Sequence, residues 1–336
     1  MKTYILGAGS SYEFGYPLGK DIFPKAQEMA YGDLQSMKSG EAKHLLRAFE
    51  NVEKSLKIMI EDLPGCPKSW PNFEEIYTFI DHELSLSTGP RVHGVTDELK
   101  KDLKTMLFHM ISECGFKPFI EDTDMFGKYA KCISNIVEDE PINIISFNYD
   151  VLLPNALKEI GITPYFGYKC FDCDDEEANR ELNFGERIIN IALPHGAVYL
   201  ADCSNCNKRY LSKDPITASI DNMRANCPEC SEGLNDNFLI LPSYIKDIEK
   251  DTDAKRILGF ISQADEIFIA GYSFPPYDYY TRVLFMIGLS RNPKNPTINI
   301  IDVVKQEDAE KNYSFIDSNK YSVDFYLNGF YEKFRS

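Results

Sequence analysis

Short apolar runs that end in turn residues recur along the chain, with segments of helical length between several of them. Runs of this length that alternate with helices are typical of a parallel sheet covered by helices on both faces. The pattern therefore predicts a doubly wound, parallel, Rossmann-like α/β sheet. The runs are Tyr4–Leu6, Ile142–Ile145, Ile188–Leu193, Glu266–Ala270 and Ile298–Ile301, and a last strand and a short helix are expected at Tyr321–Tyr326 and Phe330–Phe334.

Two stretches interrupt this alternation. Between residues 32 and 130 the apolar positions change to helical spacing, and Pro71-Asn72 precedes one of the helix signals, which predicts a helical insertion. From 198 to 240, polar and turn residues surround four cysteines, which indicates a small module held by a metal. The predicted division is a core of 1–31, 131–197 and 241–336, an insertion of 32–130 and a zinc-binding module of 198–240.

Composition and charge exclude several classes of protein. The chain has 336 residues and a formal net charge of -16, so a broad basic face for nucleic acid or an anionic membrane is not expected. Apolar runs stay well short of the roughly 18 residues of a membrane span. Because the run before Gly7 is also shorter than the core of a secretion signal, we expect a cytoplasmic protein.

The cysteines give the strongest single motif. Cys203-x-x-Cys206 and Cys227-x-x-Cys230 can each supply two thiolates to a tetrahedral zinc ion. All four positions would be sulfur, so the zinc is expected to be structural. A further pair, Cys170 and Cys173, precedes an acidic run that raises thiol pKa values, and whether it binds anything is left open.

A glycine-rich loop follows the first strand. Gly7, Ala8 and Gly9 come directly after the apolar run, Gly15 follows, and a helix is expected to begin between Pro17 and Lys20. Backbone N–H groups at such a turn can face a phosphate. Glycine pairs after strands are also common in plain turns, so the phosphate-binding interpretation depends on this context.

Polar residues stand at the ends of later strands, where open α/β sheets bind ligands. Asn148 and Asp150 follow one strand, although either could instead cap the next helix. His195 follows another strand, and Pro194 and Gly196 are expected to expose its ring at the sheet edge. A packed, hydrogen-bonded histidine is the alternative.

Two more strand ends carry candidate binding residues. Gly271 and Ser273 follow the run that ends at Ala270, and they could bind a phosphate. Asp302 follows the run that ends at Ile301, where it could bind a ribose hydroxyl or cap the next helix.

Taken in this order, the motifs resemble those of the sirtuin family over nearly the whole core. The resemblance implies that NAD+ is the ligand. It further implies that Asn148 and Asp150 lie against the nicotinamide ribose and that His195 is the catalytic histidine. The other positions implied are Gly7, Ala8, Gly9, Ser11, Gly15 and Pro17 in the glycine loop, Gly271 and Ser273 as phosphate contacts, Asp302 near the adenosine ribose, and Cys203, Cys206, Cys227 and Cys230 in a zinc ribbon.

The sequence differs from protein-deacylating sirtuins mainly in the segments that bind the protein substrate. Leu18-Gly19-Lys20 replaces the Asp-Phe-Arg element of protein-deacylating sirtuins, and Phe147 replaces the glutamine before Asn148. The stretch 239–244, with Pro242, replaces the segment that pairs with an acyl peptide. With its insertion, the chain looks like the sirtuin-like domains of bacterial anti-phage defence proteins, which destroy NAD+.

The expected activity is therefore NAD+ glycohydrolysis in anti-phage defence. The resemblance implies that Asn148 orients the ribose or a water molecule and that His195 is a general base. An NAD-dependent protein deacylase or ADP-ribosyltransferase is the first alternative, and a non-catalytic NAD or ADP-ribose sensor is the second. A homo-oligomer or a partner defence protein is the expected assembly.

Overall fold

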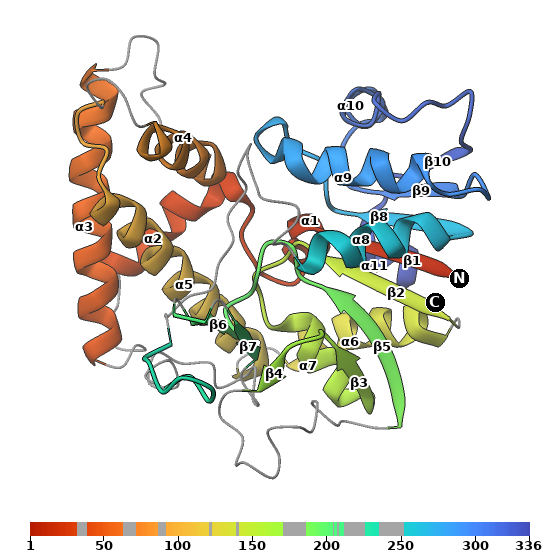
Figure 1. Cartoon of the computed structure of the whole chain (residues 1–336), viewed down its shortest axis with the longest axis horizontal. Coiled ribbons are helices and arrows are strands. Elements are labelled where there is room, and N and C mark those ends of the chain that lie inside the picture. Colours follow the sequence, from red (N-terminus) through yellow and green to blue (C-terminus); the bar gives the residue numbers. More distant parts are fainter. Residues whose placement is uncertain are drawn as a thin grey trace.

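A seven-stranded sheet forms the centre of the molecule (Figure 1). Every neighbouring pair is parallel, and the strand order is β10-β9-β8-β1-β2-β5-β3. The structure is a computed structural model, and it describes residues 1–31, 39–62, 72–86, 92–120, 123–138, 141–170, 186–203, 205–206, 208–211, 226–234 and 252–336. The strands are β1 (Lys2–Leu6), β2 (Ile142–Ser146), β3 (Ile162–Tyr165), β5 (Arg187–Ala192), β8 (Glu266–Ala270), β9 (Thr297–Ile301) and β10 (Val323–Tyr326).

The sheet confirms the predicted doubly wound class and each strand expected from the sequence. From β1 the chain builds one half through β2, β3 and β5, and it then returns to the other side of β1 to build β8, β9 and β10. The order therefore reverses between β1 and β8, which is the place where sheets of this kind bind ligands. The pattern analysis missed β3, an edge strand that contains Pro164, because proline weakens a strand signal.

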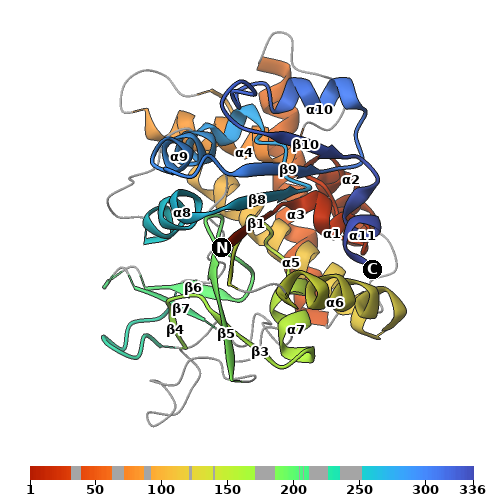
Figure 2. The ribbon, with the colours of Figure 1, turned by 90° about the vertical axis from the view of Figure 1, so that its right-hand side faces the viewer.

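Helices cover both faces of the sheet (Figure 2). Tyr4 and Leu6 of β1 pack in one apolar cluster with α6, α7 and α11, and Ile5 between them packs on the opposite face with α8 and α9. This alternation is the period-two geometry of a strand buried on both sides. The helices of the core are α1 (Ala8–Tyr12), α6 (Thr123–Glu138), α7 (Leu152–Glu159), α8 (Thr252–Gln263), α9 (Tyr279–Ser290), α10 (Gln306–Asn312) and α11 (Gly329–Phe334).

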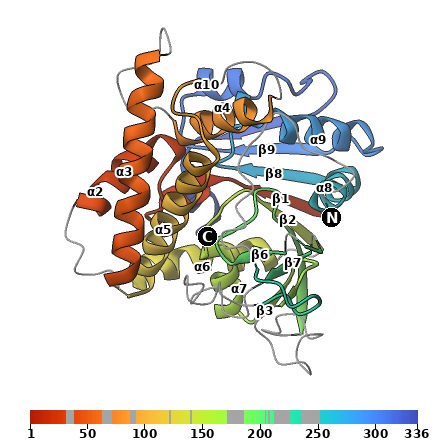
Figure 3. The ribbon, with the colours of Figure 1, turned by 60° about the vertical axis from the view of Figure 1, so that its left-hand side comes forward.

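The predicted helical insertion stands beside the carboxyl ends of the strands (Figure 3). Asn72 caps the start of its helix α4 (Phe73–Ser85), since the Asn72 Oδ1 accepts from the backbone N–H groups of Glu74 and Glu75 at 2.9 and 3.4 Å. Helix α6 crosses the predicted boundary at residue 130 and packs with the core on α7. The insertion and the segment leading into it contain a 3-10 turn η1 (Gly19–Asp21), α2 (Ile22–Tyr31), α3 (Ser39–Asp62), α4 (Phe73–Ser85) and α5 (Asp97–Ile120).

A second, three-stranded sheet lies at the edge of the core. Its order is β4-β7-β6, formed by β4 (Lys169–Cys170), β6 (Leu200–Asp202) and β7 (Arg209–Leu211). Strands β6 and β7 fall within the expected module of 198–240, whereas β4 comes from the segment before it, and four cysteines meet next to this sheet. Within the described parts of the chain, no helix has the length and apolar character to cross a membrane.

Candidate functional site

A cavity of about 470 Å³ runs along the carboxyl ends of five neighbouring strands. Residues after β9, β8, β1, β2 and β5 line it in spatial order, so it crosses the point where the strand order reverses. The structure therefore brings together residues that are up to about 300 positions apart. Of the predicted site residues, those that line the cavity are Ala8, Gly9, Ser11, Pro17, Asn148, Asp150, His195, Gly271, Ser273 and Asp302.

The glycine loop packs closely against the end of β8. Gly7 N–H donates to Ala270 O and Gly9 N–H to Gly271 O, both at 2.9 Å. A Cβ atom on Gly7 would lie 2.4 Å from the Cβ of Tyr272, so only glycine fits there. Gly7 itself does not line the cavity, and its role in this structure is to permit this approach.

This loop also corrects one expectation. Helix α1 begins at Ala8, directly after Gly7, and not between Pro17 and Lys20, where a short 3-10 turn forms instead. Because the amides of Gly7 and Gly9 are bonded to carbonyl oxygens, a bound diphosphate needs other donors as well. The exposed Ser273 and Lys20 side chains line the cavity and can supply them.

Asn148 lines the cavity where it passes the end of β2. Its Nδ2 donates to Ser10 Oγ at 3.2 Å and to Ser11 Oγ at 2.9 Å. Ser10 donates its own proton to Gly7 O at 2.7 Å, so its oxygen can only accept from Asn148, and this fixes the orientation of the amide. Among the residues that the structure describes, Asn148 Oδ1 then has no hydrogen-bond partner, and the residue is only 7% exposed. A buried acceptor of this kind is an expected partner for a ligand hydroxyl or water.

Asp150 caps the start of α7 and also lines the cavity. Its Oδ1 accepts from Leu152 N–H at 2.9 Å. Burial raises the pKa of Asp150 to about 6, while hydrogen bonds from the Ser11 hydroxyl and the Leu152 amide oppose that shift. Ser11 therefore links Asp150 to Asn148.

His195 is held in a buried cage, which contradicts the expectation of an exposed ring. The side chain is 2% exposed, and the rings of Phe147 and Tyr149 pack on it with centroids 4.9 and 6.0 Å away. Gly196 takes a positive φ of 68°, so the chain turns back sharply after the histidine and its ring stays inside.

Asp278 faces this histidine. Its Oδ2 lies 2.9 Å from His195 Nε2, and the carboxyl group is fully buried. It also accepts hydrogen bonds from Tyr272 Oη and, at 2.9 Å, from Thr281 Oγ1. A carboxylate in this position favours a proton on Nε2 and leaves Nδ1 as the basic nitrogen.

A second acid reaches the cavity from the insertion. Glu74, in the first turn of α4, lines the cavity and accepts a hydrogen bond from Tyr277 Oη at 2.7 Å. Burial raises the pKa of Glu74 to about 7, the Tyr277 bond opposes this, and the charges of Asp278 and Glu75 add to it.

Asp302 lies at the opposite end of the cavity. Its Oδ1 accepts from the adjacent Val303 N–H at 2.7 Å, and helix α10 begins at Gln306, so Asp302 shapes the turn instead of capping that helix. Burial raises the pKa of its carboxyl group.

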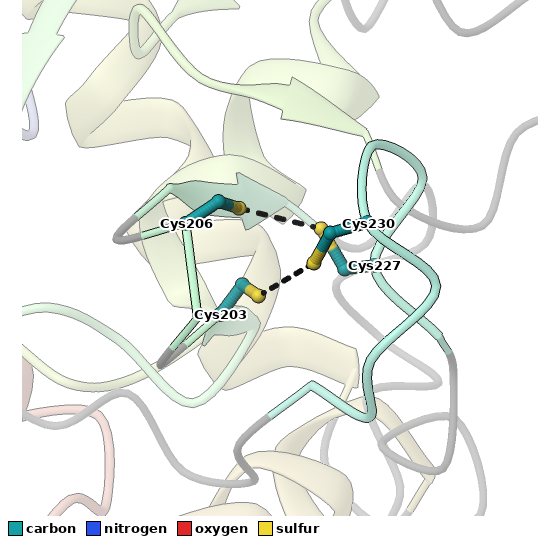
Figure 4. Close-up of side chains that lie close together, drawn as sticks. All are labelled: Cys203, Cys206, Cys227 and Cys230. Carbon is teal, nitrogen blue, oxygen red and sulfur yellow. Dashed lines mark hydrogen bonds between the residues drawn. The ribbon is translucent and has the colours of Figure 1, made fainter.

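The four predicted zinc ligands converge (Figure 4). The sulfur atoms of Cys203 and Cys230 are 3.4 Å apart, those of Cys206 and Cys227 are 3.5 Å apart, and all four lie within 4.8 Å of one another. Thiolates at about 2.3 Å from a tetrahedral zinc would be about 3.8 Å apart, so the cluster fits that ion.

The surroundings of the cysteines suit a structural metal. Cys203 N–H donates to Lys208 O at 2.9 Å and Cys227 N–H to Glu232 O at 2.7 Å, which closes two tight turns. The buried Tyr210 hydroxyl lies 3.2 Å from Cys227 Sγ, where it can support a thiolate. None of the four cysteines lines the cavity. The second cysteine pair was also singled out, but Cys173 lies outside the described residues.

No protein-family model matches the chain, and no curated protein matches it either. The chain is similar to solved structures of Sir2 proteins. A mutant Sir2 homologue in complex with 2'-O-acetyl ADP ribose is 13% identical, with a TM-score of 0.46, over 99% of this chain and 88% of that one. A Sir2 complex with a p53 peptide and NAD+ is 14% identical, with a TM-score of 0.42, over 100% of this chain and 90% of that one.

Sequence patterns missed Asp278 and Glu74. Neither residue follows a strand directly, and an acid in the first turn of a helix is common for reasons of helix electrostatics alone. The one usable signal was Pro275-Pro276, a rigid turn that holds Asp278 at a fixed distance after Gly271.

Proposed function

We propose that the chain is an NAD+ glycohydrolase that acts in the cavity along the strand ends. The observation that carries the proposal is the pairing of two features in one cavity. Asn148 presents a buried oxygen that has no partner among the described residues, and in the same cavity His195 lies against the buried carboxyl group of Asp278. A binding module would not need an oriented imidazole, whereas a hydrolase needs a base.

The reaction breaks the bond between nicotinamide nitrogen and ribose C1. Nicotinamide leaves with the bonding electron pair, and a sugar cation of oxocarbenium character forms. Water attacks C1, and His195 takes the proton that the water loses. Asn148 would hold the water or a ribose hydroxyl through Oδ1. Nicotinamide and ADP-ribose are the products.

The remaining groups would position the dinucleotide. The diphosphate would lie over the glycine loop between Gly9 and Ser273, and Asp302 would meet the adenosine ribose. Four cysteines would hold a structural zinc ion that takes no part in the reaction. We further propose, from the resemblance of the motifs, that a homo-oligomer or a complex with a partner protein uses this reaction to deplete NAD+ during anti-phage defence.

Substitutions at the two proposed catalytic positions test this function. His195→Ala and Asn148→Ala should each lower NAD+ cleavage by about 10²- to 10⁴-fold, because each removes a group that acts on the water. The matched control is His93→Ala, since His93 is exposed and lies outside the cavity lining. Nicotinamide release is measured alongside thermal stability and zinc content. Cleavage by His195→Ala at the parental rate would contradict the proposal.

Asp278 is a positioning residue in this proposal. Asp278→Asn should reduce kcat by at least about tenfold with little change in KM, because the amide keeps the size of the carboxyl group but not its charge. Thr281→Val serves as the control, since it removes one hydrogen bond to Asp278 and keeps the carboxylate. A rise in KM alone would assign Asp278 to substrate binding instead.

A further inference from the structure

Acidic side chains are distributed unevenly along the length of the cavity. At the β2 and β5 end, Asp150 and Glu74 line the wall, and Asp278 lies directly behind His195. At the β9 end, Asp302 is the one acidic residue among those that line the cavity. A ligand with a positive charge at one end would therefore bind in a defined direction.

Glu74 has few compensating contacts among the described residues. Its described contacts are the hydrogen bond from Tyr277 and the like charges of Asp278 and Glu75, and within the described residues it forms no ion pair. Gly19 of η1 packs beside it, since a Cβ there would lie 3.1 Å from Glu74 Oε2. The insertion thus carries a poorly compensated acid into the cavity.

A metal ion does not explain this arrangement. Among the described residues, the four cysteines form the one group of His, Cys, Asp and Glu side chains close enough to bind a metal. A second observation at the same end points to an organic ligand: Asn148 is more than nine-tenths buried, and its Oδ1 has no hydrogen-bond partner within the described ranges of the chain. A ligand that carries both a hydroxyl group and a delocalised positive charge fits this end of the cavity. The hydroxyl could donate to Asn148 Oδ1, and the positive charge could lie near the carboxyl groups.

The oxidised nicotinamide nucleoside has this chemistry, since its ring is a pyridinium cation and its ribose carries hydroxyl groups. We propose that Glu74 is a specificity-determining residue that holds a negative charge beside the pyridinium ring and so selects NAD+ over NADH, whose ring is uncharged. This inference rests on the proposed function and gives the insertion a direct role in substrate choice.

The charge of Glu74 makes the selection depend on pH. Because burial raises the pKa of Glu74 to about 7, the side chain is largely neutral at pH 6 and largely charged at pH 8. The groups that act on it are Tyr277 and Asp278 on η5 (Pro276–Asp278), Glu75 on its own helix, and Tyr149 after β2. Lys20 on η1 lines the same cavity. NAD+ affinity should therefore rise with pH through about 7.

The test compares three ligands in the His195→Ala background, which keeps Asn148 and in which NAD+ cleavage is expected to be about 10²- to 10⁴-fold slower. Dissociation constants for NAD+, NADH and ADP-ribose are measured by calorimetry with Glu74, with Glu74→Gln and with Glu75→Gln. Glu75 is the matched control because it is exposed, neighbours Glu74 and does not line the cavity. At pH 8, Glu74→Gln should weaken NAD+ binding about tenfold and change the binding of the other two ligands less than about twofold. At pH 6 the difference should largely disappear.

Tyr277→Phe is a second variant that keeps the acid. It removes the hydrogen bond that stabilises the charged carboxylate, so the rise of NAD+ affinity should move to higher pH. Equal weakening of all three ligands by Glu74→Gln, or the same effect from Glu75→Gln, would overturn the selection by charge. If NAD+ and ADP-ribose bind without selectivity, this inference alone fails. If neither binds, the proposed function fails with it.

Discussion

Two buried polar side chains of the candidate site are held in place by neighbouring hydroxyl groups. Ser10 and Ser11 fix the amide of Asn148, and Tyr272 and Thr281 bond the carboxyl group of Asp278. A buried polar group without a hydrogen bond lowers the folding stability by about 1 to 3 kcal/mol. An oxygen without a described partner in a cavity wall therefore indicates a position where a ligand binds.

Asp302 provides a residue-scale prediction at the end of the cavity far from His195. Asp302→Ala should raise the KM for NAD+ about tenfold and leave kcat within about twofold, because its expected contact is with the remote ribose. Asp302→Asn is the control, since an amide keeps an acceptor for that ribose. Steady-state kinetics measures both, and an unchanged KM with a collapsed kcat would refute the assignment.

The sequence predicted the site residues that follow strands. Asn148, His195 and Asp302 could be chosen because parallel strands bring their carboxyl ends to one edge. Glu74 and Asp278 could not, because their importance comes from burial beside groups far away in the sequence. Burial of His195 was also not predictable, since the aromatic rings that cover it belong to β2 and its loop.

At the scale of elements, the close approach of α1 to β8 shapes the middle of the cavity. Gly271 has a φ of 62°, and a Cβ atom there would lie 2.3 Å from the Ser10 amide nitrogen and 2.4 Å from the Gly9 carbonyl carbon. We expect Gly271→Ala to destabilise the protein by about 3 kcal/mol or more, since both the strained φ and backbone atoms oppose it.

Gly259→Ala is the matched control for this substitution. Gly259 lies in α8, and a Cβ there would approach Gln263 Nε2 no closer than 4.0 Å. Alanine should stabilise that helix by up to about 1 kcal/mol. Urea unfolding distinguishes the two variants, and equal midpoints for Gly271→Ala and the parent would contradict the packing described.

The cysteine cluster gives a second prediction for a single element. Cys227→Ser should lose the zinc and loosen the module, because the binding energy of a structural zinc is largely folding energy. Cys114→Ser, in α5, should keep the zinc. Elemental analysis of protein purified without chelator decides this, and an absence of zinc from the parent would contradict the site. The paired spacing of the cysteines in the sequence was sufficient to predict that they meet. The start of α1 could not be predicted, because Gly7 has no side chain to mark it as a helix cap.

At the scale of the whole molecule, the buried acids predict how stability depends on pH. The pKa of Asp150 rises from 3.8 to about 6 on burial, so the folded state binds a proton more tightly than the unfolded chain. The stability is therefore highest below the unfolded value and falls as the pH rises from about 4 to about 6, by on the order of 3 kcal/mol from this residue.

Asp150→Asn tests that dependence because asparagine keeps the cap and cannot ionise. The unfolding free energy of this variant should vary less between pH 4 and pH 6.5 than that of the parent. The comparison isolates Asp150 from the other acids, which are the same in both proteins. If the unfolding free energies of the parent and of Asp150→Asn changed equally with pH, the result would contradict the burial of the Asp150 carboxyl group.

In the proposed reaction, water captures the ribose of NAD+ without any protein substrate. The most direct measurement is nicotinamide release from NAD+ by the purified full chain, with and without an acyl-lysine peptide, over a range of protein concentrations that spans its assembly states. We predict release above background that the peptide does not change and that His195→Ala abolishes. Background release at every concentration, or release that appears only with the acyl-lysine peptide, would contradict the account.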